Sequence, residues 1–394
     1  APDNAGNDAY VTPDGAGKKD GSDWDNALAG NAGGLQAAWD SAGAGKTVFV
    51  ASGTYAEVQL LIKTGGTSSS SPKCFIGVDR GAGRPVFQGS WKKEAPEAGK
   101  PLIVVSSGAS YIEIRDLELK SYKSAVIASG PNTGLHISNV DVQDSRDAFV
   151  FDGGATAEKP DGGSHDILLQ DCEIIRYTKR GVRIQDGVSQ MRVINCVADA
   201  GGKDYCVEVF PIGFAVQGNY RSKLPGVMDH DIHFINCEAR GNYNDAGKDK
   251  YWNADGFCAE HNTRDLVYIN CRAFDNTDGG WDVKSPNPVL VGCVAARNKR
   301  NYRLWSNPGP ALMVNCIGEN AILRGGSGTA AGLHASGGNI YVQGSTFRNN
   351  NIGVDLDKSS AIVTLLQTKI EVPADGKAST IEDGGVLRVI DEKK

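Results

Sequence analysis

Residues 253–284, NADGFCAEHNTRDLVYINCRAFDNTDGGWDVK, contain two similar strand-and-turn units in succession. Each unit carries polar and acidic residues: Asn253, Asp255 and Glu260 in the first, and Asp275, Asp278 and Asp282 in the second. Cys258 and Asp282 occupy equivalent positions, and their spacing is close to the shortest repeat period found elsewhere in the chain. If this spacing is one coil of a solenoid, Asp282 lies beside Cys258, and the Asp278 turn lies beside the Asp255 turn. The stretch therefore predicts a repeat that brings three carboxylates to one small volume.

The same strand pattern recurs along the chain from about residue 110. The matching segments are YIEIRDLEL, LHISNVDVQ, DILLQDCEI, MRVINCVAD, DIHFINCEA, DLVYINCRA, PVLVGCVAA, ALMVNCIGE and IYVQGSTFR. The equivalent positions are Leu117, Val140, Cys172, Cys196, Cys237, Cys271, Cys293, Cys316 and Ser345. Their shortest separations, roughly 22–24 residues with longer insertions elsewhere, indicate one repeating unit with loops added on one side. A propeller blade would need about 40–45 residues, so the short period disfavours a β-propeller.

A second strand follows each turn, as in DAFVFDG, RGVRIQD, DYCVEVF, DGFCAEH, GGWDVKS and NYRLWSN. Alternation along these strands places one face inward and the other outward. Two or three short strands per repeat, stacked in register, predict an all-β fold: a single right-handed parallel β-helix. We expect one domain over residues 1–394.

Within that domain, residues 1–45 are expected to form an N-terminal strand and cap, residues 46–355 the coils, and residues 356–394 the closing strands. The cap includes a short amphipathic helix over residues 34–42, because Leu35, Ala38 and Trp39 follow helical spacing. A solenoid needs such a cap over its first coil. The 50 glycines suit many sharp turns.

Charge and hydropathy exclude several classes of protein. The formal net charge of −6 argues against general nucleic-acid binding, which requires a basic surface. No apolar run approaches the roughly 18 residues of a membrane span. The sequence starts at Ala1 and Pro2, without a methionine or an apolar leader, which fits either a mature exported product or a trimmed chain. We expect a secreted or periplasmic monomer.

Six of the nine cysteines share one repeat position, namely Cys172, Cys196, Cys237, Cys271, Cys293 and Cys316. Free cysteine behaves as a small hydrophobic residue, so these side chains are expected to form a buried internal ladder. Cys206 and Cys258 fall instead at outward positions of second strands. If their coils are neighbours, a disulfide between them is within reach.

The outward positions of the second strands form two rows. Aligned on the inward apolar residues, the first row is Val150, Arg183, Cys206, Cys258, Asp282 and Arg303, and the second is Asp152, Gln185, Glu208, Glu260, Lys284 and Trp305. This mixture of carboxylates, cations and an aromatic ring suits a carbohydrate-binding surface as well as a solvated one. The cations Arg183, Lys284 and Arg303 favour an acidic sugar. Arg183, Glu260, His261 and Trp305 are candidate substrate-binding residues.

Two kinds of chemistry fit such a face. Calcium prefers six to eight oxygen ligands, and Asp255, Asp278 and Asp282 supply several. A cation there would neutralise a uronate carboxylate and acidify the adjacent proton, so that a base starts β-elimination. Alternatively, paired aspartates would act as acid and base in glycoside hydrolysis, and a non-catalytic carbohydrate-binding β-helix stays open as a third alternative.

The succession of NADGF and NTDGGWD resembles the family 9 polysaccharide lyases, which are parallel β-helix pectate lyases. The resemblance implies that Asp255, Asp278 and Asp282 are calcium (Ca²⁺) ligands. The family has a further acidic residue where this chain has Gly279, and its lysine base aligns with Arg303 in NYRL. It implies a lyase that cleaves a uronic-acid-containing polysaccharide with the aid of calcium.

The identity of the base is open between Arg303 and Lys284. Guanidinium stays protonated above pH 12 and is a poor proton acceptor unless its pKa is strongly depressed. Lysine shifts its pKa more readily near other cations. Arg303 has two other roles open to it, as a clamp for the substrate carboxylate or as a salt-bridge partner of Asp282.

Overall fold

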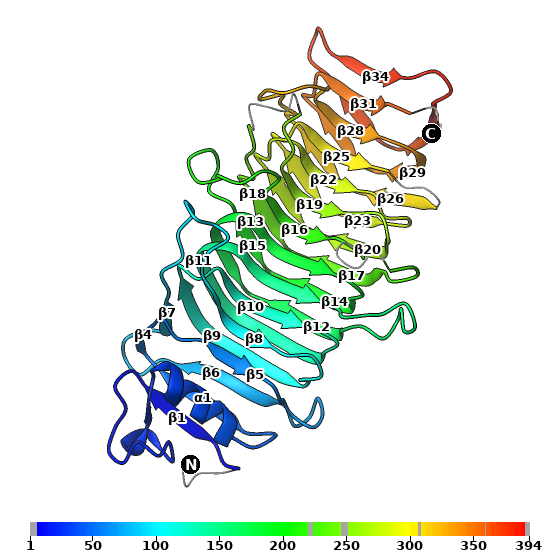
Figure 1. Ribbon diagram of the computed structural model, residues 1–394. Helices are drawn as coiled ribbons and strands as arrows, with labels where there is room; N and C mark the ends of the chain where they lie inside the picture. The colour runs from blue at the N-terminus through cyan, green and yellow to red at the C-terminus, as the bar shows by residue number, and fades with distance from the viewer. Residues whose placement is uncertain (1–5, 220–223, 246–250, 306–308, 359, 391–394) are drawn as a thin grey trace.

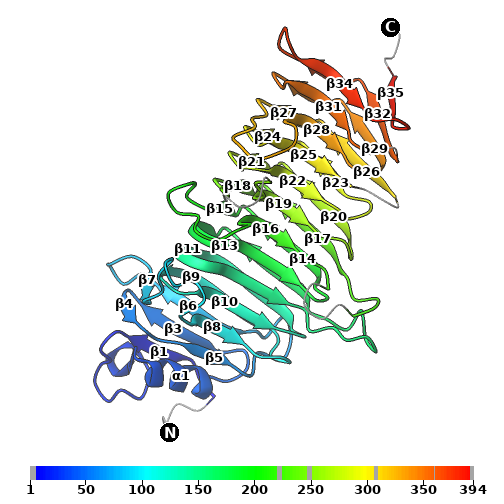
Figure 2. The ribbon, with the colours of Figure 1, turned by 45° about the horizontal axis from the view of Figure 1, so that its top comes forward.

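The chain forms a long stack of parallel β-coils (Figures 1 and 2). The computed structural model describes residues 6–219, 224–245, 251–305, 309–358 and 360–390. The two ends of the chain lie at opposite ends of the stack, with the helix α1 (Ala32–Ser41) across the N-terminal end. No helix in these ranges is long and apolar enough to cross a membrane.

Each coil contributes strands to three ladders, and every strand pairs in parallel with its counterparts in the neighbouring coils. The first ladder contains β1 (Ala9–Thr12), β3 (Thr47–Ala51), β6 (Lys73–Val78), β9 (Ile112–Lys120), β11 (Thr133–Asp152), β12 (His165–Gln170), β14 (Ser189–Ile194), β17 (Asp229–Ile235), β20 (Thr263–Ile269), β23 (Val289–Val291), β26 (Pro310–Val314), β29 (Gly338–Gln343), β32 (Ala361–Leu366) and β35 (Val386–Ile390). The second ladder contains β4 (Gly53–Ala56), β7 (Pro85–Gln88), the later parts of β9 and β11, β13 (Glu173–Gln185), β15 (Val197–Asp199), β18 (Glu238–Arg240), β21 (Arg272–Phe274), β24 (Val294–Ala296), β27 (Ile317–Glu319), β30 (Thr346–Arg348) and β33 (Lys369–Glu371).

The third ladder carries the candidate site. It contains β5 (Leu60–Ile62), β8 (Pro101–Val105), β10 (Ser124–Ser129), the last parts of β11 and β13, β16 (Ile212–Val216), β19 (Asp255–Ala259), β22 (Gly279–Val283), β25 (Arg300–Leu304), β28 (Ala331–Ala335), β31 (Ile352–Leu356) and β34 (Lys377–Ile381). Two short elements, η1 (Trp24–Asn26) and β2 (Leu28–Ala29), complete the N-terminal end beside β1.

A left-handed residue turns the chain from the first ladder into the second. Asn195, Asn236, Asn270 and Asn315 have φ angles of 53° or 54° and directly precede four of the aligned cysteines. Only glycine, asparagine and aspartate adopt this conformation at low cost. The Asn-Cys dipeptides of the sequence therefore mark the corners of the coils.

The aligned cysteines form the predicted internal ladder. All six are buried, and all nine cysteines of the chain are free thiols. The Sγ atom of Cys237 donates to the Val193 carbonyl at 3.2 Å, and that of Cys271 donates to the Phe234 carbonyl at 3.3 Å, each in the preceding coil. Small thiols thus fill the corners and bond one coil to the next.

A stack of aromatic rings fills the core behind the third ladder. Phe257 stacks on Phe214 at 5.0 Å and on Trp281 at 4.8 Å between ring centroids, and Trp281 stacks on Tyr302 at 5.0 Å. These rings are fully buried or nearly so. They hold the backbone of β16, β19, β22 and β25 in fixed register beneath the outward side chains.

The structure confirms the all-β parallel β-helix and the capping helix. The helix begins at Ala32 rather than residue 34, because the Asn31 side chain caps it by accepting from the Gly34 amide at 2.8 Å. Strands β32 to β35 continue the three ladders at the C-terminal end.

The prediction of a second strand in DYCVEVF is wrong. Residues 205–208 lie in a loop, and β16 (Ile212–Val216) takes the expected place, with Phe214 opposite Phe257 and Ala215 opposite Cys258. Cys206 therefore lies outside the row and forms no disulfide with Cys258; its Sγ donates to the Gly241 carbonyl at 3.7 Å. Glu208 likewise leaves the second row, and Gln217 follows β16 at that position.

A buried ladder of asparagine side chains supports the turn that carries Asp278. Asn276 donates to Asn298 at 2.8 Å and accepts from the Asn242 side chain at 2.8 Å. All three are fully buried.

We expect Asn276→Ala to lower the free energy of unfolding by about 1–3 kcal/mol, because it leaves the buried Asn242 amide without its acceptor. Urea unfolding followed by circular dichroism measures the change. Asn351→Ala, at an exposed position, is the control and is expected to stay within about 0.5 kcal/mol of the wild type. Equal effects of the two substitutions would show that the asparagine ladder contributes nothing specific.

Candidate active site

The outward side chains of the third ladder lie in two rows along the stack. In the first row, Cys258, Asp282, Arg303 and His334 are direct neighbours in successive coils, so Asp282 lies beside Cys258 as predicted. The second row is displaced by two residues, and it includes Glu260, Lys284 and Trp305. Neighbouring strands lie about 4.8 Å apart, so charges in successive coils interact directly.

Asp278 is buried at the turn before β22 and is surrounded by donors. The Tyr251 hydroxyl donates to Asp278 Oδ2. Lys299 Nζ and Arg300 Nη1 each lie 3.5 Å from Asp278 Oδ1. The amides of Lys299 and Arg300 also donate to the Asp278 carbonyl at 2.9 and 3.2 Å. Both the side chain and the backbone of Asp278 are therefore held by the next coil.

Asp282 lies one coil from Arg303, and its carboxylate, like that of Asp278, is surrounded by donors. Trp305 Nε1 donates to Asp282 Oδ1 at 2.8 Å. Lys284 Nζ and Arg303 Nη1 lie 3.7 and 3.8 Å from Asp282 Oδ2. Burial raises the pKa of Asp282 above its ordinary value, although Lys284 and Arg303 act in the opposite direction.

Asp255 is the least neutralised of the three aspartates. Its Oδ1 accepts from the Gly279 amide at 2.7 Å. Burial, and then the nearby Asp278 and Asp282, raise the pKa of Asp255 well above its ordinary value. A Cβ atom at Gly279 would lie 2.8 Å from Asp255 Oδ1, so any side chain there would displace this carboxylate.

Lys284 and Arg303 are both held as cations. Lys284 Nζ lies 2.9 Å from Glu260 Oε2. Burial works to lower the pKa of Lys284, but Cys258, Asp282 and Glu260 outweigh it and raise the pKa. For Arg303, too, burial works to lower the pKa and is outweighed, chiefly by Asp282. Proton acceptance is therefore unfavourable for either residue in this arrangement.

Comparison with known proteins places the chain in a family. The family model described as "Pel9A-like, right handed beta helix region" matches residues 9–370. The chain belongs to this family. Its description confirms the predicted right-handed parallel β-helix and agrees with the resemblance to family 9 polysaccharide lyases. No curated protein sequence matches significantly.

Solved structures with a similar fold include proteins of different activities. Pectate lyase Pel9A is 15% identical, with 96% of this chain and 80% of that chain covered and a TM-score of 0.49. The A-module of the Azotobacter vinelandii mannuronan C-5 epimerase AlgE6 is 13% identical, with 93% and 97% covered and a TM-score of 0.57. The catalytic domain of a GH87 α-1,3-glucanase is 10% identical, with 91% and 67% covered and a TM-score of 0.57. At these identities the likeness to the epimerase and the glucanase shows a shared fold and no particular reaction.

Within this Pel9A-like chain, the predicted site residues do not all gather. Asp255, Asp278, Asp282, Lys284 and Arg303 lie together, with Glu260 and Trp305 at their edge. Arg183 lies in the first row, but Ala215 and Cys258 separate it from Asp282, and its Nη2 pairs with Asp147 Oδ1 at 2.8 Å. His261 is exposed in the turn after β19. Their roles stay predictions.

Tyr251, Lys299, Arg300 and His334 also belong to the site, although the motifs did not reveal them. Tyr251 OH accepts from Arg300 at 2.8 Å and from Arg303 at 2.9 Å, and thus links the cations to Asp278. Arg300 follows Asp278 by the shortest period of the repeat, so the period held a signal for the Lys299-Arg300 pair. Tyr251 lies in a loop that follows no period.

Among the described residues, no group of three or more histidine, cysteine, aspartate or glutamate side chains is arranged to hold a metal ion. The oxygens of Asp278 and Asp282 face ammonium, guanidinium, hydroxyl and indole donors instead. These contacts leave Asp278 and Asp282 facing hydrogen-bond donors, an arrangement that does not fit a calcium ion. Calcium binding, which the resemblance implies, stays a prediction that the binding measurements below test.

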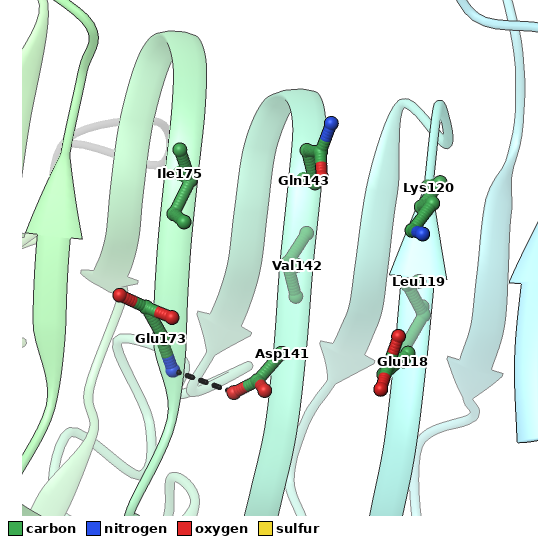
Figure 3. Close-up of a pocket in the computed structure, with 8 residues that line it drawn as sticks. All are labelled: Glu118, Leu119, Lys120, Asp141, Val142, Gln143, Glu173 and Ile175. Carbon is green, nitrogen blue, oxygen red and sulfur yellow. Dashed lines mark hydrogen bonds between the residues drawn. The ribbon is translucent and has the colours of Figure 1, made fainter. Parts of the chain in front are cut away.

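A hollow on the second ladder offers other acidic side chains (Figure 3). Its lining residues are Glu118, Leu119, Lys120, Asp141, Val142, Gln143, Glu173 and Ile175. Asp141 accepts from the Glu173 amide at 3.1 Å, and Arg84 bridges Asp141 and Glu118. The carboxylates of Asp141 and Glu118 are thus already bonded, and the hollow lies on a different ladder from the candidate site.

His334 extends the first row beyond Arg303. Its Nδ1 lies 3.0 Å from Asp355 Oδ2, and its Nε2 lies 2.9 Å from Asp357 Oδ2, so the ring is held between two carboxylates. Burial works to raise the pKa of Asp355, but His334, Thr380 and Thr329 outweigh it and hold the pKa below its ordinary value.

Because the folded-state pKa of Asp355 lies below the unfolded value, the unfolded chain binds more protons, and stability falls as the pH drops from about 4. We expect Asp355→Asn to be less stable than the wild type at neutral pH and to lose less stability between pH 6 and pH 3. Thermal unfolding at a series of pH values measures this. Asp383→Asn, at an exposed position, should follow the wild-type profile. Identical pH profiles for Asp355→Asn and the wild type would refute the role given to Asp355.

Proposed function

We propose that this protein is a polysaccharide lyase that cleaves a uronate-containing polymer by β-elimination. The observation that carries the proposal is the placement of Arg303 and Lys284, two charged cations at the outer face of a long β-ladder, directly over buried carboxylates. Membership of the Pel9A-like family and the similarity in fold to enzymes of acidic polysaccharides support this class of substrate.

In the proposed reaction, Arg303 and Lys284 bind the carboxylate of one uronate residue. Neutralising this carboxylate acidifies the proton on the adjacent C5 carbon and stabilises the negative charge that develops when the proton leaves. The C5–H electron pair then forms the C4–C5 double bond, and the glycosidic oxygen on C4 leaves with its bonding pair and takes a proton from solvent water. Both cations remain charged throughout and serve as the clamp.

Glu260 is the proposed proton acceptor. Its side chain is 37% exposed, and its Oε2 lies 2.9 Å from Lys284 Nζ, so it reaches the substrate side of the site. A carboxylate accepts a proton far more readily than a guanidinium group whose pKa is raised. Trp305 lies under the Arg303 guanidinium at 4.2 Å and orients it.

The burial of the aspartates argues against glycoside hydrolysis by Asp255 and Asp282. Both are at most 3% exposed, and their oxygens accept from Gly279 and Trp305. A hydrolase needs two carboxyl groups that reach the glycosidic bond and a water molecule.

The proposal also includes the predicted acidic-polysaccharide partner, the monomeric state and the secreted or periplasmic location.

The reaction is tested by incubating the protein with polygalacturonate, alginate, glucuronan and glycosaminoglycans. A lyase yields an unsaturated product that absorbs in the near ultraviolet. New reducing ends without this absorbance would identify a hydrolase instead, and binding without cleavage would identify a carbohydrate-binding β-helix.

We expect Glu260→Gln to lower kcat by about 10²–10⁴-fold, since general base catalysis contributes this much. Arg303→Ala should lower kcat/KM by about 10²–10³-fold through loss of a charge-stabilising donor. Initial rates on the cleaved polymer measure both. Arg192→Ala, exposed on the first ladder, is the control and should retain wild-type rates. Wild-type activity in Glu260→Gln would show that Glu260 is not the proton acceptor.

A further inference from the structure

The cluster around Asp255, Asp278 and Asp282 contains as many cations as carboxylates. The carboxylates are Asp255, Glu260, Asp278 and Asp282, and the cations are Lys284, Lys299, Arg300 and Arg303. Four negative and four positive groups give a formal charge of zero. Such a cluster needs no added ion to balance it.

Lys299 and Arg300 are the buried members of the cationic set. The Lys299 side chain is fully buried, with Nζ 4.1 Å from the centroid of the Tyr251 ring and 3.5 Å from Asp278 Oδ1. The Arg300 side chain is 6% exposed and reaches both Tyr251 and Asp278. Buried charges are strongly unfavourable without an opposite charge, so these two cations and Asp278 depend on one another.

The position of Arg300 in the stack explains why its side chain reaches Asp278. Arg300 pairs directly with Gly279 in the preceding coil. Gly279 leaves room at this point, because it has no side chain and its amide is bonded to Asp255. A glycine in one coil and a cation in the next thus bring positive charge to the volume between the aspartates.

We propose that Lys299 and Arg300 do the work of a bound divalent cation at this site, so that the centre is complete without calcium. Calcium requires six to eight oxygen ligands at about 2.3–2.6 Å. Here the buried cations already neutralise Asp278, and Lys284 and Arg303 neutralise Asp282. Removing the two buried charges would leave the cluster with an excess of two negative charges and turn it into a cation site. The consequence for turnover rests on the proposed lyase function, whereas the consequence for metal binding does not.

The binding test uses calcium chloride, with isothermal titration calorimetry and thermal unfolding as readouts. For the wild type we expect no binding heat up to about 1 mM calcium, the weak end of protein sites, and no change in Tm. In the double variant Lys299→Met/Arg300→Met, calcium should bind and raise Tm, because a ligand that binds only the folded state stabilises it.

Two further variants are needed, one as a control and one in case the double variant does not fold. The exposed pair Arg348→Met/Lys377→Met removes the same charge elsewhere and should not create binding. If the buried double variant fails to fold, Arg300→Met alone retains the Lys299 pairing with Asp278 and should show weaker calcium binding. Stoichiometric binding to the wild type that disappears in Asp278→Asn would overturn the inference, as would the absence of binding to both the single and the double variant.

The turnover test separates this inference from the proposed function. On any polymer that the wild type cleaves, we expect full activity after exhaustive chelation, and loss of activity that calcium restores would contradict the inference. If no polymer is cleaved, the proposed function fails, and the binding measurements still decide whether Lys299 and Arg300 replace a metal ion.

Discussion

The parallel hydrogen bonding of each strand to its counterparts in the adjacent coils determines where every outward side chain lies. Neighbouring strands are about 4.8 Å apart, so one substitution places a charge beside the equivalent residues of the coils before and after it. The left-handed asparagine corners and the stacked rings of Phe257, Trp281 and Tyr302 keep this register constant. Because the register is constant, the acidic and basic side chains of Asp282, Arg303, His334 and Asp355 lie next to one another along one row.

The rows bring together charges that would be costly in isolation. Removing one partner of a buried ion pair costs about 3–5 kcal/mol, because the other charge is left without compensation. Asp278 avoids this cost through Lys299, Arg300 and Tyr251. Arg303 and Lys284 lie further out, at 13% and 17% side-chain exposure. In the proposed reaction these two cations bind the substrate, whereas Lys299 and Arg300 lie deeper and pair with Asp278.

The sequence predicted the parts of the structure that depend on local pattern. The Asn-Cys corners and the short, regular coils between them sufficed to place Cys258, Asp282 and Arg303 in one row. The prediction failed for Cys206 and Glu208, because the long insertion between Cys196 and Cys237 carries an apolar segment that resembles the true strand, Ile212–Val216. Tyr251 was missed because its contacts depend on how a loop folds, which the repeat does not specify. For Arg183 and His261, the repeat predicted that both side chains lie on the outward face but did not predict how far they lie from Asp282.

The fold is shared with an epimerase and a glucanase, so the architecture alone does not determine the reaction, and the placement of the side chains does. The most direct measurement is a crystal structure of the protein with an oligouronate bound. We expect a uronate carboxylate within hydrogen-bonding distance of both Arg303 and Lys284, with Glu260 facing the C5 carbon. An oligouronate bound on another ladder, or with its carboxylate turned away from these two cations, would contradict the proposed function.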